Sequence, residues 1–327
     1  MPTCASPYLL QTVLRDFWNF TDEAHWVTSD CDAVQNIYNA HYYEKDGPHA
    51  AAAALNAGTD YDCGQTYPGS LMSAYTQGLF NESTLDRATI RRYSLLVKLG
   101  YFDPASIQPY RSLSWSDVNT PASQQLAYRA AVEGITLLKN DGTLPLSTSK
   151  PQKIALIGPW ANATTMMQGN YQGIAPYLVS PLQAISAEPG VTVLYAPGII
   201  GQSDSTNISM PAVTAAAEDA DVIIYMGGID ESIESEGMDR INITWPAAQI
   251  TLINELATYG KPFAVFQFGG GNSHDTELIH FKKLTANTTK IGQVDSTFIK
   301  NKKSIGSLVW GGYPGKTRQH SQHEAHG

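Results

Sequence analysis

The first third of the chain alternates stretches of helically spaced apolar residues with short polar turns. Apolar side chains three and four positions apart share one face of a helix, so these stretches predict amphipathic helices that pack on a core. Pro7 stands near one helix start, Gly58 ends an Ala-rich stretch and Asn81 precedes the longest stretch. We therefore expect helices at Ser6–Phe17, Pro48–Ala57, Ser70–Gln77, Asn81–Gly100 and Ala122–Leu138.

The pattern changes after Leu146, where short, continuously apolar runs alternate with helical ones. The expected strands are Ile154–Ile157, Val191–Tyr195, Val222–Met226, Phe263–Phe268 and Ser307–Trp310, and the expected helices are Ala212–Ala220 and Ala247–Tyr259. Apolar strands separated by helices predict an α/β fold with a mainly parallel sheet covered on both faces. Ligands approach such sheets at the carboxyl ends of their strands.

A segment without clear periodicity separates these two regions. Residues 105–121 are rich in Ser, Pro, Gln and Tyr, a composition typical of an interdomain linker. The length of 327 residues fits two domains. We expect the first domain at residues 1–104 and the second at residues 122–315.

Composition restricts the class of protein. Hydrophobic residues make up 43% of the chain, which is enough to form folded cores, and charged residues make up only 16%. Its formal net charge is −9 without a basic stripe, so we expect neither nucleic acid nor membrane partners, and no apolar run is long enough to cross a bilayer. The Asn-x-Ser/Thr sequons favour a secreted glycoprotein, although no signal peptide follows Met1; they begin at Asn19, Asn81, Asn162, Asn207, Asn242 and Asn287.

One acidic stretch is a candidate for catalysis. Trp26–Val34 begins as a β-type run and leads directly into Ser-Asp-Cys-Asp. Barrels of parallel strands present catalytic groups at the carboxyl ends of their strands, where a carboxylate such as Asp30 meets substrate. The alternative is structural: Asp30 or Asp32 caps the helix that follows. Gly58–Gly64 forms a second acidic turn.

Another acidic stretch follows the strand expected at Val222–Met226. The loop Gly227–Arg240 carries five carboxylates, at Asp230, Glu231, Glu234, Glu236 and Asp239. Closely packed carboxylates raise one another's pKa values, so that one of them stays protonated near neutral pH. A protonated carboxyl here and an ionised Asp30 would form the pair that glycoside hydrolysis requires. The alternative is a solvated acidic loop.

Gly269-Gly270-Gly271 follows a strand in the manner of a phosphate-binding loop. It lacks both the Lys-Ser/Thr ending and the spaced glycines of nucleotide-binding motifs. A tight strand exit with positive φ explains the glycines instead, so we expect no nucleotide here.

The ordered motifs of the chain resemble glycoside hydrolase family 3, and in particular its fungal β-xylosidases. The resemblance covers residues 2–271 and about 292–315, and its most specific parts are Ser29–Val34, Gly58–Gly64, Leu99–Phe102, Gly134–Asn140, Glu234–Arg240 and Leu308–Gly315. It implies the C-terminal remnant of a TIM-like barrel joined by a linker to an incomplete α/β sandwich domain. It also implies a retaining, exo-acting enzyme that removes β-linked xylose from xylo-oligosaccharides, with no metal or organic cofactor.

The resemblance also implies roles for particular residues. The family nucleophile lies in a Ser-Asp-Trp or Ser-Asp-Cys motif, which here gives Asp30. The acid/base aligns best with Glu236, and Glu234 is the runner-up because loop lengths vary. Cys31 is typical of the xylosidase branch; we expect it to pair with Cys63 and to narrow the pocket against glucose, the alternative being two buried free thiols. Most sugar-binding residues of the family lie upstream of the matched segment.

The chain departs from the family pattern near its end. Residues 272–291 have no counterpart, and we interpret them as a read-through intron. Residues 316–327 diverge and include His320, His323 and His326 at the spacing of metal ligands, although a tail from outside the family explains them better. As a fragment, the chain is expected to be weakly active or inactive. The competing hypotheses are a non-catalytic sugar-binding or interaction remnant, and a β-glucosidase or α-arabinofuranosidase specificity.

Overall fold

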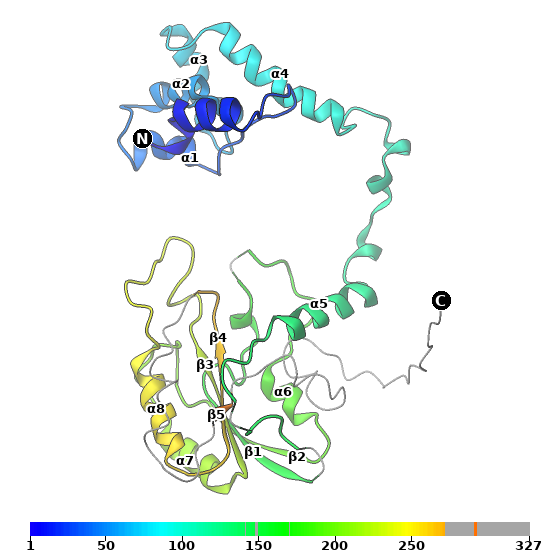
Figure 1. The fold of residues 1–327 in the computed structure, drawn as a ribbon, viewed down its shortest axis with the longest axis vertical. Helices are drawn as coiled ribbons and strands as arrows, with labels where there is room; N and C mark the ends of the chain where they lie inside the picture. The colour runs from blue at the N-terminus through cyan, green and yellow to red at the C-terminus, as the bar shows by residue number, and fades with distance from the viewer. Residues whose placement is uncertain (141, 148–149, 170, 272–290, 293–327) are drawn as a thin grey trace. The chain divides into compact units, whose positions relative to one another are not determined.

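The chain forms two compact units. The computed structural model describes residues 1–140, 142–147, 150–169, 171–271 and 291–292. Its contacts separate Met1–Ser114 from Trp115–Gly327, and each unit has its own hydrophobic core (Figure 1). None of the helices in these residues combines the length and apolarity that a membrane span requires.

The first unit is helical. Its helices in chain order are a 3-10 helix at Thr3–Ala5, a π-helix at Tyr8–Phe17, α1 (Ala33–Asn39), α2 (Gly47–Ala57), α3 (Thr66–Thr76) and α4 (Glu82–Lys98). The helical periodicity of the sequence is confirmed for four of these. The seven-residue α1 was not expected, because two turns are too short to show an apolar period.

The Ala-rich helix α2 forms the centre of this unit. Asp46 caps its start, where the carboxylate accepts a hydrogen bond from the backbone N of His49 at 3.0 Å. Gly58 ends it with φ 114°, a conformation that disfavours any residue with a Cβ. Small side chains along α2 let α1 and α3 approach closely, and the buried cluster includes Ala50, Ala54 and Leu55.

The strand expected before Asp30 is reduced to a single parallel bridge. Thr28 pairs with Tyr61, and the backbone N of Asp60 donates to the O of Val27 at 2.8 Å. A strand extends only where neighbours satisfy its backbone groups on both sides. Among residues 1–114, the Tyr61 segment is the one partner of this run, so a bridge forms in place of a regular strand.

The second unit is built on a parallel sheet with strand order β2-β1-β3-β4-β5. The strands are β1 (Gln152–Ile157), β2 (Val191–Ala196), β3 (Val222–Gly228), β4 (Phe263–Phe268) and β5 (Ile291–Gly292). The four strands expected between residues 154 and 268 and the α/β fold class are thereby confirmed. The strand expected at Ser307–Trp310 lies outside the described residues.

Helices cover both faces of the sheet, with α7 (Met210–Asp219) and α8 (Ala247–Ala257) on one face and α6 (Pro181–Ser186) on the other (Figure 1). Alternate residues of the strands β1 to β4 enter two separate cores. Ile157 and Ile223 pack with α7 and α8, whereas Leu156 and Ile224 pack with Trp160 and α6. This two-sided burial explains why the strands are continuously apolar.

Irregular sequence precedes the sheet. Residues 105–117 form short 3-10 helices at Ala105–Ile107, Pro109–Ser112 and Trp115–Asp117. The helix α5 (Pro121–Gly134) follows, and the Thr120 side chain caps it by accepting a hydrogen bond from the backbone N of Ser123 at 3.1 Å. Three-residue turns with no buried side chain carry no periodic signal, which is why the sequence reads as irregular here.

Candidate active site

Asp30 lies on an exposed turn directly after the Thr28–Tyr61 bridge. Its Oδ1 accepts a hydrogen bond from the backbone N of Cys31 at 2.7 Å, and its backbone O accepts one from Ala33 at 3.1 Å. Asp32 occupies the N-cap of α1 with a left-handed φ of 61°, but its side chain makes no capping hydrogen bond. The structural alternative for this stretch was that a carboxylate caps α1. The structure shows no such side-chain cap.

A second turn clamps the turn that carries Asp30. The backbone N of Ser29 donates to Tyr61 O at 2.9 Å, and the N of Asp32 donates to Cys63 O at 2.7 Å. The N of Cys63 donates to the Ser29 hydroxyl at 3.0 Å. A disulfide joins Cys31 to Cys63, whose Cα atoms lie 4.3 Å apart. The residues on both sides of Asp30 are thus fixed, while its carboxylate stays exposed.

Asp60 supports these two turns through two buried ion pairs. Its Oδ2 lies 3.1 Å from Arg15 and its Oδ1 lies 3.1 Å from Arg91, while its side chain is only 1% exposed. Oδ2 also accepts a hydrogen bond from the backbone N of Val27 at 3.0 Å. One carboxylate therefore ties the run that leads to Asp30 to two distant helices. The sequence marks Gly58–Gly64 as acidic but carries no local signal for these arginines.

A cavity of about 300 Å³ lies beside the same turn. Tyr61, Asp62, Tyr67 and Arg92 are among its lining residues, and Asp30 is not. Burial raises the pKa of the Tyr67 hydroxyl well above its usual value, with the Asp62 and Asp60 carboxylates adding to this effect. The hydroxyl donates to Thr59 O at 2.7 Å. The Tyr67 hydroxyl is therefore satisfied inside the unit, and Asp30 does not line the cavity.

The acidic loop after β3 forms a tight hairpin turn with Glu236 near its tip. Backbone bonds in both directions close the turn between Ser235 and Met238, at 3.2 and 3.0 Å. Gly237 sits in the turn with φ 75°, which favours glycine there. The Glu236 side chain is exposed. The backbone hydrogen bonds of this turn thus fix the main chain of Glu236, while its carboxyl group is exposed to solvent.

Glu234 has a different environment at the base of the same hairpin. Its Oε2 lies 2.6 Å from the Nε of Arg240, whose side chain is 7% exposed. An added Cβ at Gly271 would lie 2.3 Å from Glu234 Oε2, so the carboxylate also packs closely against the segment that follows β4. Of the two acid/base candidates, Glu234 therefore binds other residues of the loop, whereas Glu236 is exposed at the turn.

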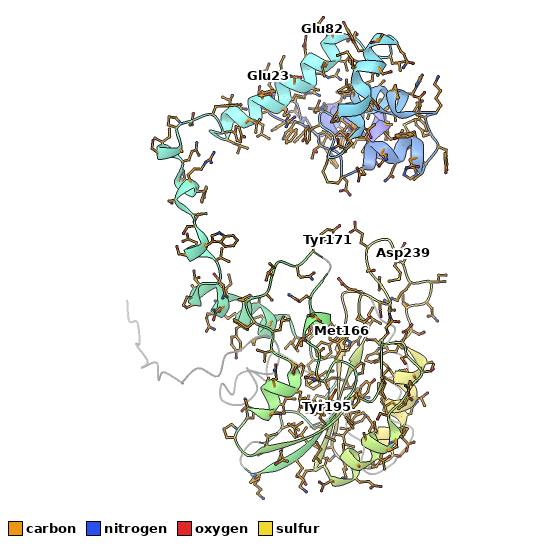
Figure 2. All side chains as sticks on the ribbon, turned by 180° about the vertical axis from the view of Figure 1, so that it is seen from behind. Glu23, Glu82, Met166, Tyr171, Tyr195 and Asp239 are labelled. Atoms are coloured by element: carbon orange, nitrogen blue, oxygen red, sulfur yellow. A yellow bond between two sulfur atoms is a disulfide. The ribbon has the colours of Figure 1, made fainter. Side chains whose placement is uncertain are left out.

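A neighbouring loop contacts Glu236. The hydroxyl of Tyr171 donates a hydrogen bond to Glu236 Oε2. Tyr171 comes from the loop between β1 and α6, and because β1 and β3 are adjacent and parallel, both loops leave the same edge of the sheet. Figure 2 shows Tyr171 and Asp239 on these two loops. No motif in the sequence marks Tyr171, although its place in a loop that follows a strand is a usable signal.

Asp230 fixes the start of the acidic loop. Burial alone would raise the pKa of its carboxyl group, but hydrogen bonds from Ser203 and Ser232 together hold that pKa below the usual value. Ser203 is completely buried and lies in the segment that follows β2. Asp230 is thus an ionised anchor between two loops, and it is not a candidate proton donor.

Asp30 belongs to the first unit and Glu236 to the second. The expectation that both carboxyl groups act on one substrate therefore stays a prediction. Among the residues that the structure describes, no cluster of three or more His, Cys, Asp or Glu side chains has the arrangement of a metal site. His320, His323 and His326 lie outside that part of the chain.

Carboxyl groups on turns that follow strands of an α/β protein are typical of enzymes that use acid–base and nucleophilic chemistry. Residues 135–323, more than half of the chain, match the model of the Glycosyl hydrolase family 3 C-terminal domain. The chain belongs to glycoside hydrolase family 3.

Similar proteins narrow the comparison. The chain is 51% identical over 314 residues to a probable exo-1,4-beta-xylosidase, bxlB, from Aspergillus terreus, and the match covers 96% of this chain and 38% of that protein. A probable exo-1,4-beta-xylosidase, xlnD, from Neosartorya fischeri is 48% identical with the same coverage. The chain thus spans about 38% of the length of these relatives.

Two solved structures of related enzymes are also similar to this chain. A GH3 exo-beta-xylosidase (XlnD) in complex with a xylobiose aziridine activity-based probe has a TM-score of 0.80 and 44% identity, covering 89% of this chain and 37% of that one. A beta-glucosidase from Listeria innocua in complex with isofagomine has a TM-score of 0.71 and 25% identity, covering 92% and 41%. The chain is closer in sequence and structure to the xylosidase than to this glucosidase.

Proposed function

We propose that this chain carries the two catalytic carboxyl groups of a retaining, exo-acting β-xylosidase whose substrates are xylo-oligosaccharides. The observation that carries the proposal is the similarity to named exo-β-xylosidases in both sequence and structure. Asp30 is the nucleophile and Glu236 the acid/base. The rest of the relatives' length contributes to the activity, so we expect the 327-residue chain alone to be weakly active or inactive.

The proposed reaction has two steps. The Asp30 carboxylate attacks the anomeric carbon while the bond to the leaving oxygen breaks and Glu236 donates its proton to that oxygen. Water then attacks the anomeric carbon, Glu236 takes a proton from the water, and the bond to Asp30 breaks. Both carboxyl groups return to their starting states, and two inversions retain the β configuration.

The local geometry supports this assignment of roles. A nucleophile must be ionised and accessible, and Asp30 is exposed on a turn held by backbone bonds and a disulfide. An acid/base must reach the leaving oxygen; Glu236 is exposed at the turn, whereas the Glu234 carboxylate is bonded to Arg240. We therefore assign the acid/base role to Glu236 rather than to Glu234.

The disulfide supports two further parts of the proposal. Cross-linking of Cys31 to Cys63 beside the nucleophile would narrow the sugar site and favour a pentose over glucose. Disulfides persist in oxidising compartments, which fits a secreted glycoprotein. The asparagines of the described sequons are all exposed: Asn19, Asn81, Asn162, Asn207 and Asn242.

The proposal is tested in a hybrid enzyme, in which residues 2–271 of this chain replace the matching segment of the Aspergillus terreus relative. We expect the hybrid enzyme to release β-xylose as the first product of an aryl β-xyloside, observed by NMR of the anomeric proton. With phenyl β-xyloside, whose leaving group needs a proton, Asp30→Asn and Glu236→Gln should each lower kcat/KM by at least about 100-fold. An α-xylose product, or full activity in either variant, would contradict the proposed roles.

The competing hypothesis of a non-catalytic remnant makes a different prediction. In that case the hybrid enzyme would fold, as judged by its circular dichroism, but would hydrolyse no glycoside. Side activity on aryl β-glucosides or α-arabinofuranosides above that on β-xylosides would favour the alternative specificities.

A further inference from the structure

We propose that Tyr171 is a positioning residue for the acid/base, and that its hydroxyl fixes which oxygen of Glu236 carries the catalytic proton. This inference rests on the proposed function, because it deepens the role assigned to Glu236. Its starting point is the hydrogen bond from the Tyr171 hydroxyl to Glu236 Oε2, which joins residues 65 positions apart.

The contact acts on the carboxyl group itself. The turn between Ser235 and Met238 fixes the backbone of Glu236, and the pair of Glu234 with Arg240 closes the base of the hairpin. A glutamate side chain still has three rotatable bonds beyond its Cα. The Tyr171 hydroxyl comes from the other loop and contacts the far end of that side chain, so it restricts the rotation that the hairpin leaves open.

The two loops are well placed to hold this geometry. Tyr171 follows β1 and Glu236 follows β3, and these strands pair in parallel from Ile154 with Val222 to Ile157 with Tyr225. Asp230 and Ser203 tie the start of the acidic loop to the segment after β2. The contact between Tyr171 and Glu236 is therefore supported from adjacent strands of one sheet, within one unit of the chain.

The chemistry follows from the hydrogen-bond inventory of a carboxyl group. A protonated carboxyl has one O–H donor and one oxygen that only accepts. Because the Tyr171 hydroxyl donates to Oε2, the proton is carried by Oε1, which is left to face the leaving oxygen. As Oε1 gives up its proton, negative charge develops on the carboxylate and the hydrogen bond to Oε2 strengthens. Tyr171 touches no reacting atom and acts only through Glu236.

The test compares leaving groups in the hybrid enzyme. Departure of a xylose unit or phenol from the anomeric carbon needs a proton from the acid, whereas 2,4-dinitrophenolate leaves without one. We expect Tyr171→Phe to lower kcat/KM about 10-fold on xylobiose and phenyl β-xyloside and less than about 2-fold on 2,4-dinitrophenyl β-xyloside. Tyr195→Phe, an exposed tyrosine of β2, is the matched control and should change neither value.

The outcomes separate this inference from the proposed function. Glu236→Gln should show the same dependence on leaving group, with a larger loss on xylobiose. If it does and Tyr171→Phe lowers all substrates equally or none of them, the positioning role is overturned while the acid/base assignment stands. If Glu236→Gln leaves hydrolysis of xylobiose intact, the proposed function itself fails. Because Tyr171 is 82% exposed, its replacement by Phe should leave the unfolding temperature unchanged.

Discussion

The Nε of Arg240 lies 2.6 Å from Oε2 of Glu234, and this pair closes the hairpin on which Glu236 is presented. The two glutamates thus have different environments. Glu234 is bonded to the Arg240 guanidinium, and Glu236 is exposed on the turn. Replacement of Glu234 should therefore affect the hairpin more than the reaction.

Glu234→Gln should weaken the hairpin without removing the chemistry. We expect the hybrid enzyme to lose about 1–2 kcal/mol of stability, since Gln keeps the shape of the side chain but loses its charge beside Arg240. Its kcat/KM should fall by less than about 10-fold and keep the wild-type dependence on leaving group, measured with aryl β-xylosides. A loss as large as that of Glu236→Gln would mean that the two roles have been exchanged.

Asp60→Ala should destabilise the first unit strongly. It removes the shared partner of Arg15 and Arg91 and leaves these side chains, only 5% and 15% exposed, without their carboxylate. Removing one partner of a buried pair costs about 3–5 kcal/mol. Denaturant unfolding of the hybrid enzyme, followed by near-UV circular dichroism, measures this loss.

The matched control for Asp60 is an exposed ion pair in the same unit. Lys98 contacts Asp22 at 2.6 Å, and their side chains are 56% and 45% exposed. Lys98→Ala should cost less than about 1 kcal/mol because exposed pairs contribute little. Equal effects of the two substitutions would show that the Asp60 pairs are not buried in solution.

Cleavage of the disulfide should loosen the turn that carries Asp30. The cross-link spans 32 positions, and a loop of that length restricts the unfolded chain by about 2–4 kcal/mol. We expect Cys31→Ser with Cys63→Ser to lower the unfolding free energy by that amount, and Cys4→Ser, at the free cysteine, to leave it nearly unchanged. Mass spectrometry of a non-reduced digest checks the linkage first; a Cys31 peptide free of Cys63 would contradict it.

Ser203→Ala should produce a pH-dependent loss of stability in the second unit. The folded pKa of Asp230 lies below its unfolded value, so its ionised form stabilises the fold above pH of about 4, and this contribution disappears as the pH falls through the folded pKa. The variant removes one donor to that carboxylate, and its melting temperature should fall by about 2–4 °C at pH 7.

The pH series separates this effect from simple loss of packing. The difference between Ser203→Ala and wild type should shrink steadily below pH of about 4, because protonated Asp230 no longer depends on the hydrogen bond. Ser205→Ala, on the same loop but bonded to the backbone of Asn207, should show no such trend. A difference that stays constant from pH 7 to pH 3 would rule out the ionised anchor.

Periodicity predicted the regular parts of this fold well. The central strand β3 was predictable because burial on both faces makes it continuously apolar, and β1, β2 and β4 were predictable from shorter apolar runs. α2 and α4 were predictable because Gly58 and Asn81 mark their ends. The prediction of a regular strand before Asp30 was wrong. A strand depends on partner strands, and the residues of the run itself do not encode those partners.

The site was only partly predictable for a related reason. Asp30 and Glu236 were predicted from two separate motifs, each a continuous stretch of sequence. The side chains that contact the two turns come from distant positions in the chain. Arg15 reaches Asp60 across 45 positions, and Tyr171 reaches Glu236 across 65. No local pattern records such pairs, since only the folded chain brings them together. The motif already favoured Glu236 over Glu234 as the acid/base, and the pairing of Glu234 with Arg240 supports that proposal.

The central claim is that Asp30 is the nucleophile of a retaining glycosidase. The most direct measurement is covalent trapping of the hybrid enzyme with 2,4-dinitrophenyl 2-deoxy-2-fluoro-β-xyloside, followed by digestion and peptide mass spectrometry. The fluorine slows both steps, and the activated leaving group allows the first, so the xylosyl-enzyme accumulates. We predict one label, on Asp30, and none in Asp30→Asn. A label on another carboxylate, or rapid turnover without any covalent intermediate, would contradict the account.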